Sequence, residues 1–309
     1  MATIPVISGK IEAHLDWDRL VDALAEGHRG PRPLLGDLFL ERGADALVSR
    51  SAWITGLGIG VKAFTVLPEN TGRGLPSVQG AMILFDDTAG RPEAVVDFDV
   101  VTKWKTAADS VLGAKLLARE DARRLLIVGA GRVARSLAEA YQAVLGPLEV
   151  TVWSRTRASA EALAARIGAH VANDLEEAVA VADIITTATL AHEPVIRGEW
   201  LRPGQHLDLI GAFKADMRET DDTALRRGRI FVDSRETTLQ HIGELLIPIR
   251  EGVISPEDVA GDLADLVAGR AGRRTADEIT IYKNGGGAHL DLMTARVILD
   301  VWQENGRPS

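Results

Sequence analysis

The chain has 309 residues, of which 46% are hydrophobic and 26% charged, so we expect two domains with well-buried cores. A net charge of -9 gives no extended positive field, which argues against nucleic acid or an anionic membrane as partner and favours small solutes. The absence of cysteine excludes a disulfide framework, a thiolate nucleophile and cysteine-ligated metal sites. With no signal-peptide pattern and no run of about 18 apolar residues, we expect a cytoplasmic protein without a membrane span.

Short strand-like runs dominate the chain before residue 120. Residues 58–64 and 81–86 are predicted strands, a turn follows at Asp87–Gly90, and residues 93–98 complete a predicted hairpin. Residues 101–118 carry apolar side chains at helical spacing, which predicts an amphipathic helix leading into the second half.

From Arg124 onward strands and helices alternate, which indicates an α/β fold with a parallel sheet and right-handed crossovers. The predicted strands are 125–129, 148–153, 170–172, 183–188, 206–212, 229–234 and 279–285, and the predicted helices between them are 132–145, 158–168 and 174–182. Residues 289–305 show a further helical pattern, and we expect this helix to return to the first domain.

A glycine-rich turn stands between an apolar strand and a helix, and its residues are Gly129, Ala130, Gly131, Arg132, Val133 and Ala134. In a dinucleotide-binding fold the first glycine permits a tight turn, the second lets the backbone approach a pyrophosphate, and a small residue at Ala134 permits close helix–strand packing. The residues from Gly129 to Val133 are therefore candidate cofactor contacts. The alternative is a turn that serves packing alone.

The next strand ends at Trp153, where enzymes that use NAD place Asp or Glu against the ribose. Here the sequence reads Ser154-Arg155-Thr156-Arg157, with no carboxylate to repel a 2′-phosphate. Arg155 can form a charge-assisted pair with that phosphate. Ser154, Arg155 and Thr156 are therefore candidate cofactor contacts, with NADP(H) preferred and NAD(H) as the alternative, unless the arginines simply begin a solvated helix.

Three basic residues in the first third are ambiguous from spacing alone. Lys62 interrupts an apolar strand, so its ammonium must be paired or face a cavity if the strand is central, whereas on an edge strand it would guard the sheet. Lys105 either points into a cleft between the domains or bridges to Asp109 one turn on, and the spacing favours the bridge. Arg32 carries no signal by itself.

No motif indicates another chemistry. The sequence has no Gly-x-Ser-x-Gly elbow, no Gly-Lys-Ser/Thr phosphate loop and no His-Glu-x-x-His zinc site. The seven histidines are scattered, so His206 and His241 are interpreted as structural residues and no metal is expected. Hydride transfer remains as the favoured chemistry.

These features together resemble the ornithine cyclodeaminase/mu-crystallin family along essentially the whole chain. The matching segments are 60–70, 101–118, 128–136, 150–156, 182–189, 206–212 and 279–292. The resemblance implies a homodimer in which residues 1–118 plus 286–309 form an α+β substrate-binding and dimerisation domain. A Rossmann NAD(P)-binding domain of residues 119–285 would be inserted into it.

The resemblance also implies roles for single residues. Lys62 is expected at the reacting centre, and Arg32 and Lys105 match the positions that hold the substrate carboxylate. Four residues at the carboxyl ends of two predicted Rossmann strands are expected to contact the cofactor: Thr187, Ala188, Thr189 and Gly211.

Two departures from the family pattern bear on the reaction. The helix motif that normally reads Arg-Thr-Ala-Ala begins here with Lys105, which replaces a bidentate fork with a point charge. In the cyclodeaminases an aspartate that assists attack of the side-chain amine follows the Gly-Gly or Gly-Ala pair, whereas here Phe213 follows Gly211-Ala212. The phenylalanine and the NADPH-type turn resemble the ketimine-reductase branch, and Lys105-Thr106-Ala107-Ala108 resembles bacterial pyrroline-2-carboxylate reductases.

Together these observations predict NADPH-dependent reduction of a cyclic imino acid, giving proline from pyrroline-2-carboxylate or pipecolate from its six-membered analogue. The alternatives are an ornithine cyclodeaminase, another amino-acid or iminosuccinate dehydrogenase, and a binding protein without turnover. Ring size would depend on pocket residues such as Trp53, Trp104 and Phe213, whose orientation the sequence leaves open. Gly285–Gly287 either let backbone approach the nicotinamide or form a flexible turn.

Overall fold

The structure is a computed structural model that describes residues 3–306. The chain ends, residues 1–2 and 307–309, which we assigned to the substrate domain, lie outside the described residues. Two compact units are present: the chain up to Lys105 together with the residues from Gly287 onward, and Thr106–Gly286. The first division falls inside helix α2 (Phe98–Leu117), whereas we placed the boundary at the end of that helix. The boundaries at 118/119 and 285/286 stay predictions.

The first unit is built on a six-stranded sheet in the order β1-β6-β5-β4-β3-β2. Its strands are β1 (Val6–Ile7), β2 (Leu34–Arg42), β3 (Asp45–Ile54), β4 (Gly58–Val66), β5 (Val78–Phe85) and β6 (Pro92–Asp97). Neighbouring strands are antiparallel apart from β1 and β6, which are parallel. The predicted hairpin at 81–98 is confirmed as β5 and β6.

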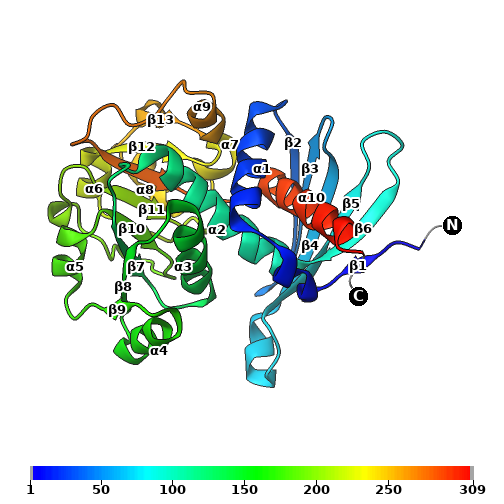
Figure 1. Ribbon diagram of the computed structural model, residues 1–309, viewed down its shortest axis with the longest axis horizontal. Helices are drawn as coiled ribbons and strands as arrows, with labels where there is room; N and C mark the ends of the chain where they lie inside the picture. The colour runs from blue at the N-terminus through cyan, green and yellow to red at the C-terminus, as the bar shows by residue number, and fades with distance from the viewer. Residues whose placement is uncertain (1–2, 307–309) are drawn as a thin grey trace. The chain divides into compact units, whose positions relative to one another are not determined.

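One face of this sheet is covered by helices. The buried side chains of β3 to β6, such as Ala52, Met82 and Val96, are all at even-numbered positions, as expected when successive residues alternate between faces. Helix α10 (Ala288–Glu304) packs on β3 and β4 and beside α1 (Trp17–Arg29), so the C-terminal helix returns to the first unit as predicted (Figure 1). Two short 3-10 helices, η1 (Gly9–His14) and η2 (Pro68–Arg73), complete the unit.

Strand β2 and its partner β3 were not predicted from the sequence. In β2, every residue but Leu35 is exposed, so its side chains show no alternation between buried and polar positions. A tight turn at Gly43, whose φ is +62°, connects the two strands. The pattern that identifies a half-buried strand is therefore absent from β2.

The second unit is an eight-stranded parallel sheet in the order β13-β12-β14-β11-β10-β7-β8-β9. Its strands are β7 (Arg124–Val128), β8 (Glu149–Trp153), β9 (His170–Val171), β10 (Ile184–Thr187), β11 (His206–Leu209), β12 (Gly228–Val232), β13 (Val259–Gly261) and β14 (Ile279–Lys283). The chain moves outward from β7 to β9 and then crosses to β10 on the other side of β7. This reversal confirms the α/β doubly wound fold and creates a switch point beside β7 and β10.

Helices cover both faces of this sheet. They are α2, α3 (Arg132–Leu145), α4 (Arg157–Ile167), α5 (Leu175–Val181), α6 (Asp222–Arg227), α7 (Arg235–Thr238), α8 (Gly243–Arg250) and α9 (Leu263–Val267), with 3-10 helices η3 (Gly198–Trp200) and η4 (Pro256–Asp258). One face has an apolar core in which Leu207 and Ile281 pack with Leu245 of α8. The opposite face is polar at its centre, because Tyr141 of α3 and Thr186 both donate to Asp208.

Candidate functional site

The glycine-rich turn lies at the carboxyl end of β7. Gly129 has a φ of +121°, and a Cβ there would lie 2.5 Å from the Ala188 carbonyl oxygen, so no larger residue fits. Gly131 is the N-cap residue of α3, no side chain caps that helix, and a Cβ added to Gly131 would meet nothing within 4 Å. The open space beside uncapped backbone N–H groups fits a pyrophosphate.

The turn after β8 carries the residues proposed to select the nicotinamide cofactor. Arg155 and Thr156 are exposed, Ser154 is half-buried, and Thr156 is the N-cap of α4. Arg157 is held by Glu161 at 2.7 Å, whereas no ion pair of Arg155 occurs among residues 3–306. Arg155 is therefore the arginine of this turn that is available to an anionic ligand.

The strand ends predicted to contact the cofactor meet on one buried carboxylate. Glu219 accepts hydrogen bonds from Thr187, Thr189 and Gly211, which lie at or just after the ends of β10 and β11. These three residues were predicted from the sequence, whereas Glu219, which lies in a loop without a recognisable motif, was not. The carbonyl of Ala188 approaches Gly129, so the same strand end also borders the glycine-rich turn.

Lys62 lies in β4, between β3 and β5, so the edge-strand interpretation is wrong. Its side chain is buried, and its Nζ donates to Asp291 Oδ1 at 2.9 Å and to Thr102 Oγ1 at 3.2 Å. The Nζ also lies 5.0 Å from the centre of the Phe98 ring. The ammonium is thus held by one carboxylate from α10 and one hydroxyl from α2, in an aromatic setting.

Burial lowers the pKa of Lys62 below its ordinary value, because a buried charge loses its hydration. Asp291 opposes that effect, while the positive charges of Lys105 and Arg50 add to it. For Asp291, burial favours the neutral acid, but Lys62 and Lys105 outweigh it and the carboxyl pKa is lowered. The charges in this unit therefore keep Asp291 ionised and make the Lys62 proton easier to release.

The three predicted basic residues have different environments. Lys105 is only 8% exposed, and no ion pair or hydrogen bond of its ammonium occurs among residues 3–306. Asp109, the alternative partner on α2, accepts a hydrogen bond from Tyr282 at 2.6 Å. Arg32 is exposed in the segment between α1 and β2 and is not among the principal charges that shift the Lys62 pKa. Only Lys62 and Lys105 are brought together.

Arg50 is the arginine that the structure places beside Lys62. The two residues are opposite each other in the register of β3 and β4, so their side chains share the covered face of the sheet. Arg50 forms a salt bridge of 3.0 Å with Asp37 of β2. Because β2 and β3 were not predicted, Arg50 could not be chosen from the sequence.

Two further residues of α10 contribute to this cluster. His289 is buried, its ring centre lies 5.5 Å from that of His28, and burial lowers its pKa to about 3, so its imidazole is neutral. Asp291 belongs to the first turn of the same helix. A carboxylate inside the otherwise apolar tail pattern is the signal that would have identified Asp291.

The aromatic residues considered for the substrate pocket have separate surroundings. Trp104 is buried and stacks on Trp17 with ring centres 3.8 Å apart, so it contributes to packing. The Trp53 indole N–H donates to Asp87 at 2.6 Å. Phe213 is 57% exposed.

The glycines after β14 form a fixed turn. Gly285 N–H donates to the Asp233 carboxylate at 2.9 Å, the N–H of Gly286 donates to it at 2.5 Å, and Gly286 has a φ of +72°. A Cβ on Gly285 would lie 2.5 Å from Thr238 Oγ1. The flexible-turn interpretation is therefore wrong for Gly285 and Gly286.

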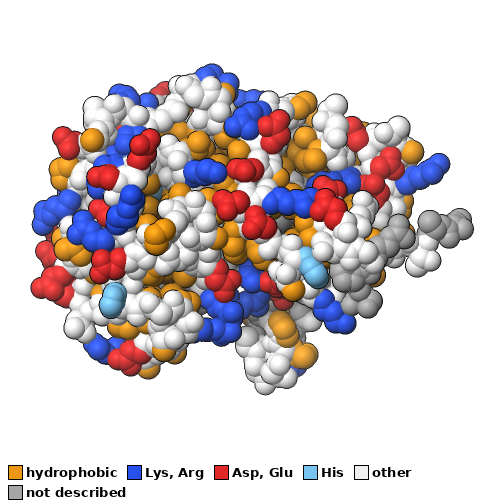
Figure 2. All heavy atoms as spheres, viewed as in Figure 1, with side chains coloured by type: hydrophobic (Ala, Val, Ile, Leu, Met, Phe, Trp, Pro, Cys, Tyr) orange, Lys and Arg blue, Asp and Glu red, His pale blue; other side chains and the backbone are white. Residues whose placement is uncertain are grey.

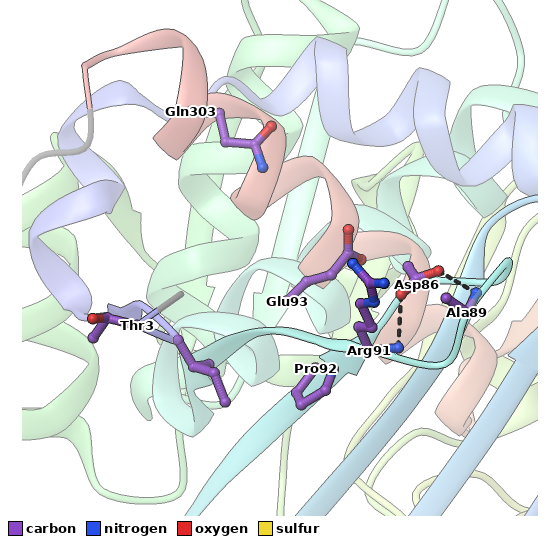
Figure 3. A pocket seen from close by; sticks show the side chains of 8 residues that line it. Thr3, Asp86, Ala89, Arg91, Pro92, Glu93 and Gln303 are labelled. Atoms are coloured by element: carbon purple, nitrogen blue, oxygen red, sulfur yellow. Dashed lines mark hydrogen bonds between the residues drawn. The ribbon is translucent and has the colours of Figure 1, made fainter. Parts of the chain in front are cut away.

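Two surface hollows lie apart from the predicted residues. One, in the first unit, is lined by Thr3, Ile4, Asp86, Ala89, Arg91, Pro92, Glu93 and Gln303, and Figure 3 shows Arg91 and Ala89 donating to Asp86. Figure 2 shows acidic and basic side chains interspersed over the face in view. Within residues 3–306, no cluster of His, Asp or Glu is arranged to hold a metal ion, and no helix is both long and apolar enough to cross a bilayer.

The parallel sheet, its switch point and the glycine-rich turn define the second unit as a dinucleotide-binding Rossmann domain. The model of the ornithine cyclodeaminase/mu-crystallin family matches residues 52–306. The chain belongs to the ornithine cyclodeaminase/mu-crystallin family.

Known relatives cover almost the whole chain. It is 55% identical over 300 residues to a Delta(1)-pyrroline-2-carboxylate reductase of Paracoccus denitrificans, covering 95% of each protein. The solved Delta(1)-pyrroline-2-carboxylate reductase of Thermococcus litoralis, in complex with NADH and L-proline, is 28% identical with a TM-score of 0.89 and 98% coverage of both chains. An archaeal alanine dehydrogenase dimer with bound NAD is 28% identical with a TM-score of 0.91, covering 99% of this chain and 98% of the other.

Proposed function

We propose that the protein reduces a cyclic imino acid with NAD(P)H, converting pyrroline-2-carboxylate to proline and accepting piperideine-2-carboxylate as the six-membered analogue. It is an oxidoreductase that acts on a carbon–nitrogen bond. The observation that carries the proposal is the buried Lys105, whose ammonium has no ion pair among residues 3–306, in the same unit as Lys62. A buried unpaired cation favours an anionic ligand, and the substrate class carries a carboxylate.

Each unit supplies one part of the proposed chemistry. Gly129 and Gly131, with the N-terminus of α3, would hold the pyrophosphate of the nicotinamide dinucleotide, which supplies the hydride when bound. Lys105 would bind the substrate carboxylate, and Arg32 is proposed as a second anchor. Lys62 would hold a proton at Nζ for the imine nitrogen, because its lowered pKa makes that proton transferable. Thr102 and Asp291 orient the ammonium.

NADP(H) is the proposed preference. The exposed Arg155 and the absence of a carboxylate at Ser154 support it, since both features accommodate a 2′-phosphate. The two solved relatives hold NADH or NAD, so NAD(H) is the competing cofactor.

An ornithine cyclodeaminase is the second candidate within the family. Phe213, which lacks any group for activating an amine, disfavours it. Ammonia release from ornithine with catalytic NAD would favour the lyase, whereas oxidation of NADPH by pyrroline-2-carboxylate supports the reductase. Another amino-acid or iminosuccinate dehydrogenase would instead prefer an open-chain substrate.

A homodimer is also proposed, and the uncovered face of the first sheet supports it. Leu38, Leu40, Leu47 and Trp53 are 56%, 55%, 42% and 47% exposed on that face. Exposed apolar patches of this kind mark association surfaces. The variant Leu38→Glu should shift the mass measured by sedimentation toward the monomer. A cytoplasmic location stays a prediction from the sequence.

The decisive assay mixes the protein with pyrroline-2-carboxylate and either NADPH or NADH. Loss of nicotinamide absorbance together with proline formation, faster with NADPH, is the expected result. A panel containing piperideine-2-carboxylate, pyruvate with ammonia, and ornithine separates the alternatives. The proposal is wrong if no cyclic imine oxidises either cofactor while another panel member does.

A further inference from the structure

A single buried carboxylate connects two loops at the carboxyl edge of the Rossmann sheet. Glu219 accepts four hydrogen bonds: from Thr187 Oγ1 at 2.7 Å, Thr189 N at 2.9 Å, Thr189 Oγ1 at 2.7 Å and Gly211 N at 2.6 Å. The side chain is fully buried. The first donor is on the last residue of β10, the next two follow β10 and the fourth follows β11, so Glu219 joins the ends of adjacent strands.

The arrangement requires a carboxylate. Oε1 accepts the backbone N–H of Thr189, and Oε2 accepts the backbone N–H of Gly211. A glutamine would turn its NH2 group toward one of these N–H groups, and neither backbone donor can rotate away. A buried donor left without an acceptor is costly.

The surrounding groups fix the position of Glu219. The buried ammonium of Lys283 donates to the carbonyls of Leu209 and Asn284. Burial lowers the pKa of Lys283, and Glu219 is the first of the carboxylates that oppose this effect. Glu244 accepts the backbone N–H of Glu219 at 2.6 Å, which fixes the segment that carries the side chain.

The joined loops also border the glycine-rich turn. A Cβ on Gly211 would lie 2.1 Å from the Thr189 carbonyl oxygen, and a Cβ on Gly129 would lie 2.5 Å from the Ala188 carbonyl oxygen. The segment after β10 is therefore in close contact with both the segment after β11 and the glycine-rich turn. Strands β10 and β11 lie on one side of β7, whereas β8, with Ser154 and Arg155 after it, lies on the other.

The order of the strands identifies which part of the cofactor these loops meet. A dinucleotide lies across the switch point, with its pyrophosphate at the turn after β7. If its 2′-phosphate end lies at Arg155, the opposite half extends over the ends of β10 and β11. We propose that Glu219 is a positioning residue that fixes Thr187, Thr189 and Gly211 to hold the nicotinamide half, a role that rests on the proposed function.

Calorimetric titration with NADH and with ADP-ribose, which lacks the nicotinamide, tests this role without requiring turnover. For Glu219→Gln we expect the Kd of NADH to rise about 10- to 100-fold, as for a lost hydrogen bond to a charged group, and the Kd of ADP-ribose to change less than about twofold. Glu193→Gln, at an exposed position of the connection between β10 and β11, should leave the Kd of both molecules unchanged.

A second pair of variants covers the case in which Glu219→Gln does not fold. Thr189→Val removes one donor to Glu219 at nearly constant volume and should raise the Kd of NADH about fivefold. Thr189→Ser keeps the hydroxyl and should leave that Kd unchanged. The positioning role is wrong if NADH binding is unchanged in Glu219→Gln and Thr189→Val, or if NADH and ADP-ribose weaken equally. If the unaltered protein binds neither NADPH nor NADH, the proposed function itself fails.

Discussion

The Lys62 ammonium and the Asp291 carboxylate, 229 positions apart in the sequence, form a buried ion pair of 2.9 Å. Asp291 raises the pKa of Lys62, and burial and the neighbouring Lys105 lower it. If the ammonium form is the active one, activity must fall as pH rises through this pKa. We therefore expect the ion pair to set the upper pH limit of the proposed reaction.

Removing the carboxylate should move that limit. In Asp291→Asn, the opposing charge is lost, so the Lys62 pKa falls further and the descending limb of kcat/KM against pH should shift to lower pH. The pH profile measures this shift, with exposed Asp18→Asn of α1 as the control. An unchanged descending limb would show that Lys62 does not control it.

Lys62→Ala should reduce turnover at least about 100-fold, the size typical of a lost general acid or base. The Kd of NADPH, measured by fluorescence titration, should stay the same because the glycine-rich turn belongs to the other unit. Exposed Lys10→Ala controls for loss of a positive charge. Retention of more than about a tenth of the activity would contradict the role of Lys62.

Arg155→Ala should raise the KM for NADPH about 10- to 100-fold and leave the KM for NADH unchanged, because only NADPH carries the 2′-phosphate. Steady-state kinetics with both cofactors measures the ratio. Arg166→Ala, exposed on α4, provides the matched control. Equal effects on the KM of both cofactors would contradict the assignment of Arg155 to the 2′-phosphate.

Asp208 should make the protein less stable as pH rises. Burial raises the pKa of Asp208 to about 6, so ionisation costs folding free energy above that pH, and the cost disappears as pH falls below the ordinary value of 3.8. Between pH 4 and pH 8, the free energy of unfolding of Asp208→Asn should therefore rise by about 2–3 kcal/mol relative to that of the unaltered protein. Urea unfolding across this range measures the gain, and a pH-independent difference would contradict it.

Asp183 should show the opposite pH dependence. Although burial favours its neutral form, Arg124 and two backbone N–H groups hold the Asp183 carboxyl pKa at about 2. Its stabilisation is complete above the ordinary value of 3.8 and is lost as pH falls toward 2. Asp183→Asn should lower the free energy of unfolding by about 1–2 kcal/mol at pH 7, and urea unfolding should show this difference narrowing below pH 4. A difference that stays constant would contradict the assignment.

The Rossmann unit was predictable because its strands are short apolar runs between amphipathic helices, and its turn needs glycine at position 129. The α/β class and the return of the last helix followed from such local patterns, whereas the role expected of Lys62 came from the family resemblance. The partners of Lys62 followed from neither. Asp291 and Arg50 reach it through the sheet register and the packing of α10, which are long-range relationships without a local signature.

Glu219 escaped prediction for a related reason. Its role depends on four donors from two strand ends, and a single glutamate in a loop resembles any solvated acid. Arg32, which was chosen from the resemblance, is exposed and is not among the principal charges that shift the Lys62 pKa. Its proposed contact with the substrate carboxylate stays a prediction.

Helix α10 follows the whole Rossmann unit in the chain, yet it covers a sheet made from strands near the N-terminus. During synthesis, the strands from β3 to β6 leave the ribosome long before their covering helix exists, while residues 106–286 can already pack. We expect a translational intermediate with a folded nucleotide-binding half and a solvent-exposed apolar sheet. Chaperones could bind that sheet until helix α10, which carries Asp291, has emerged.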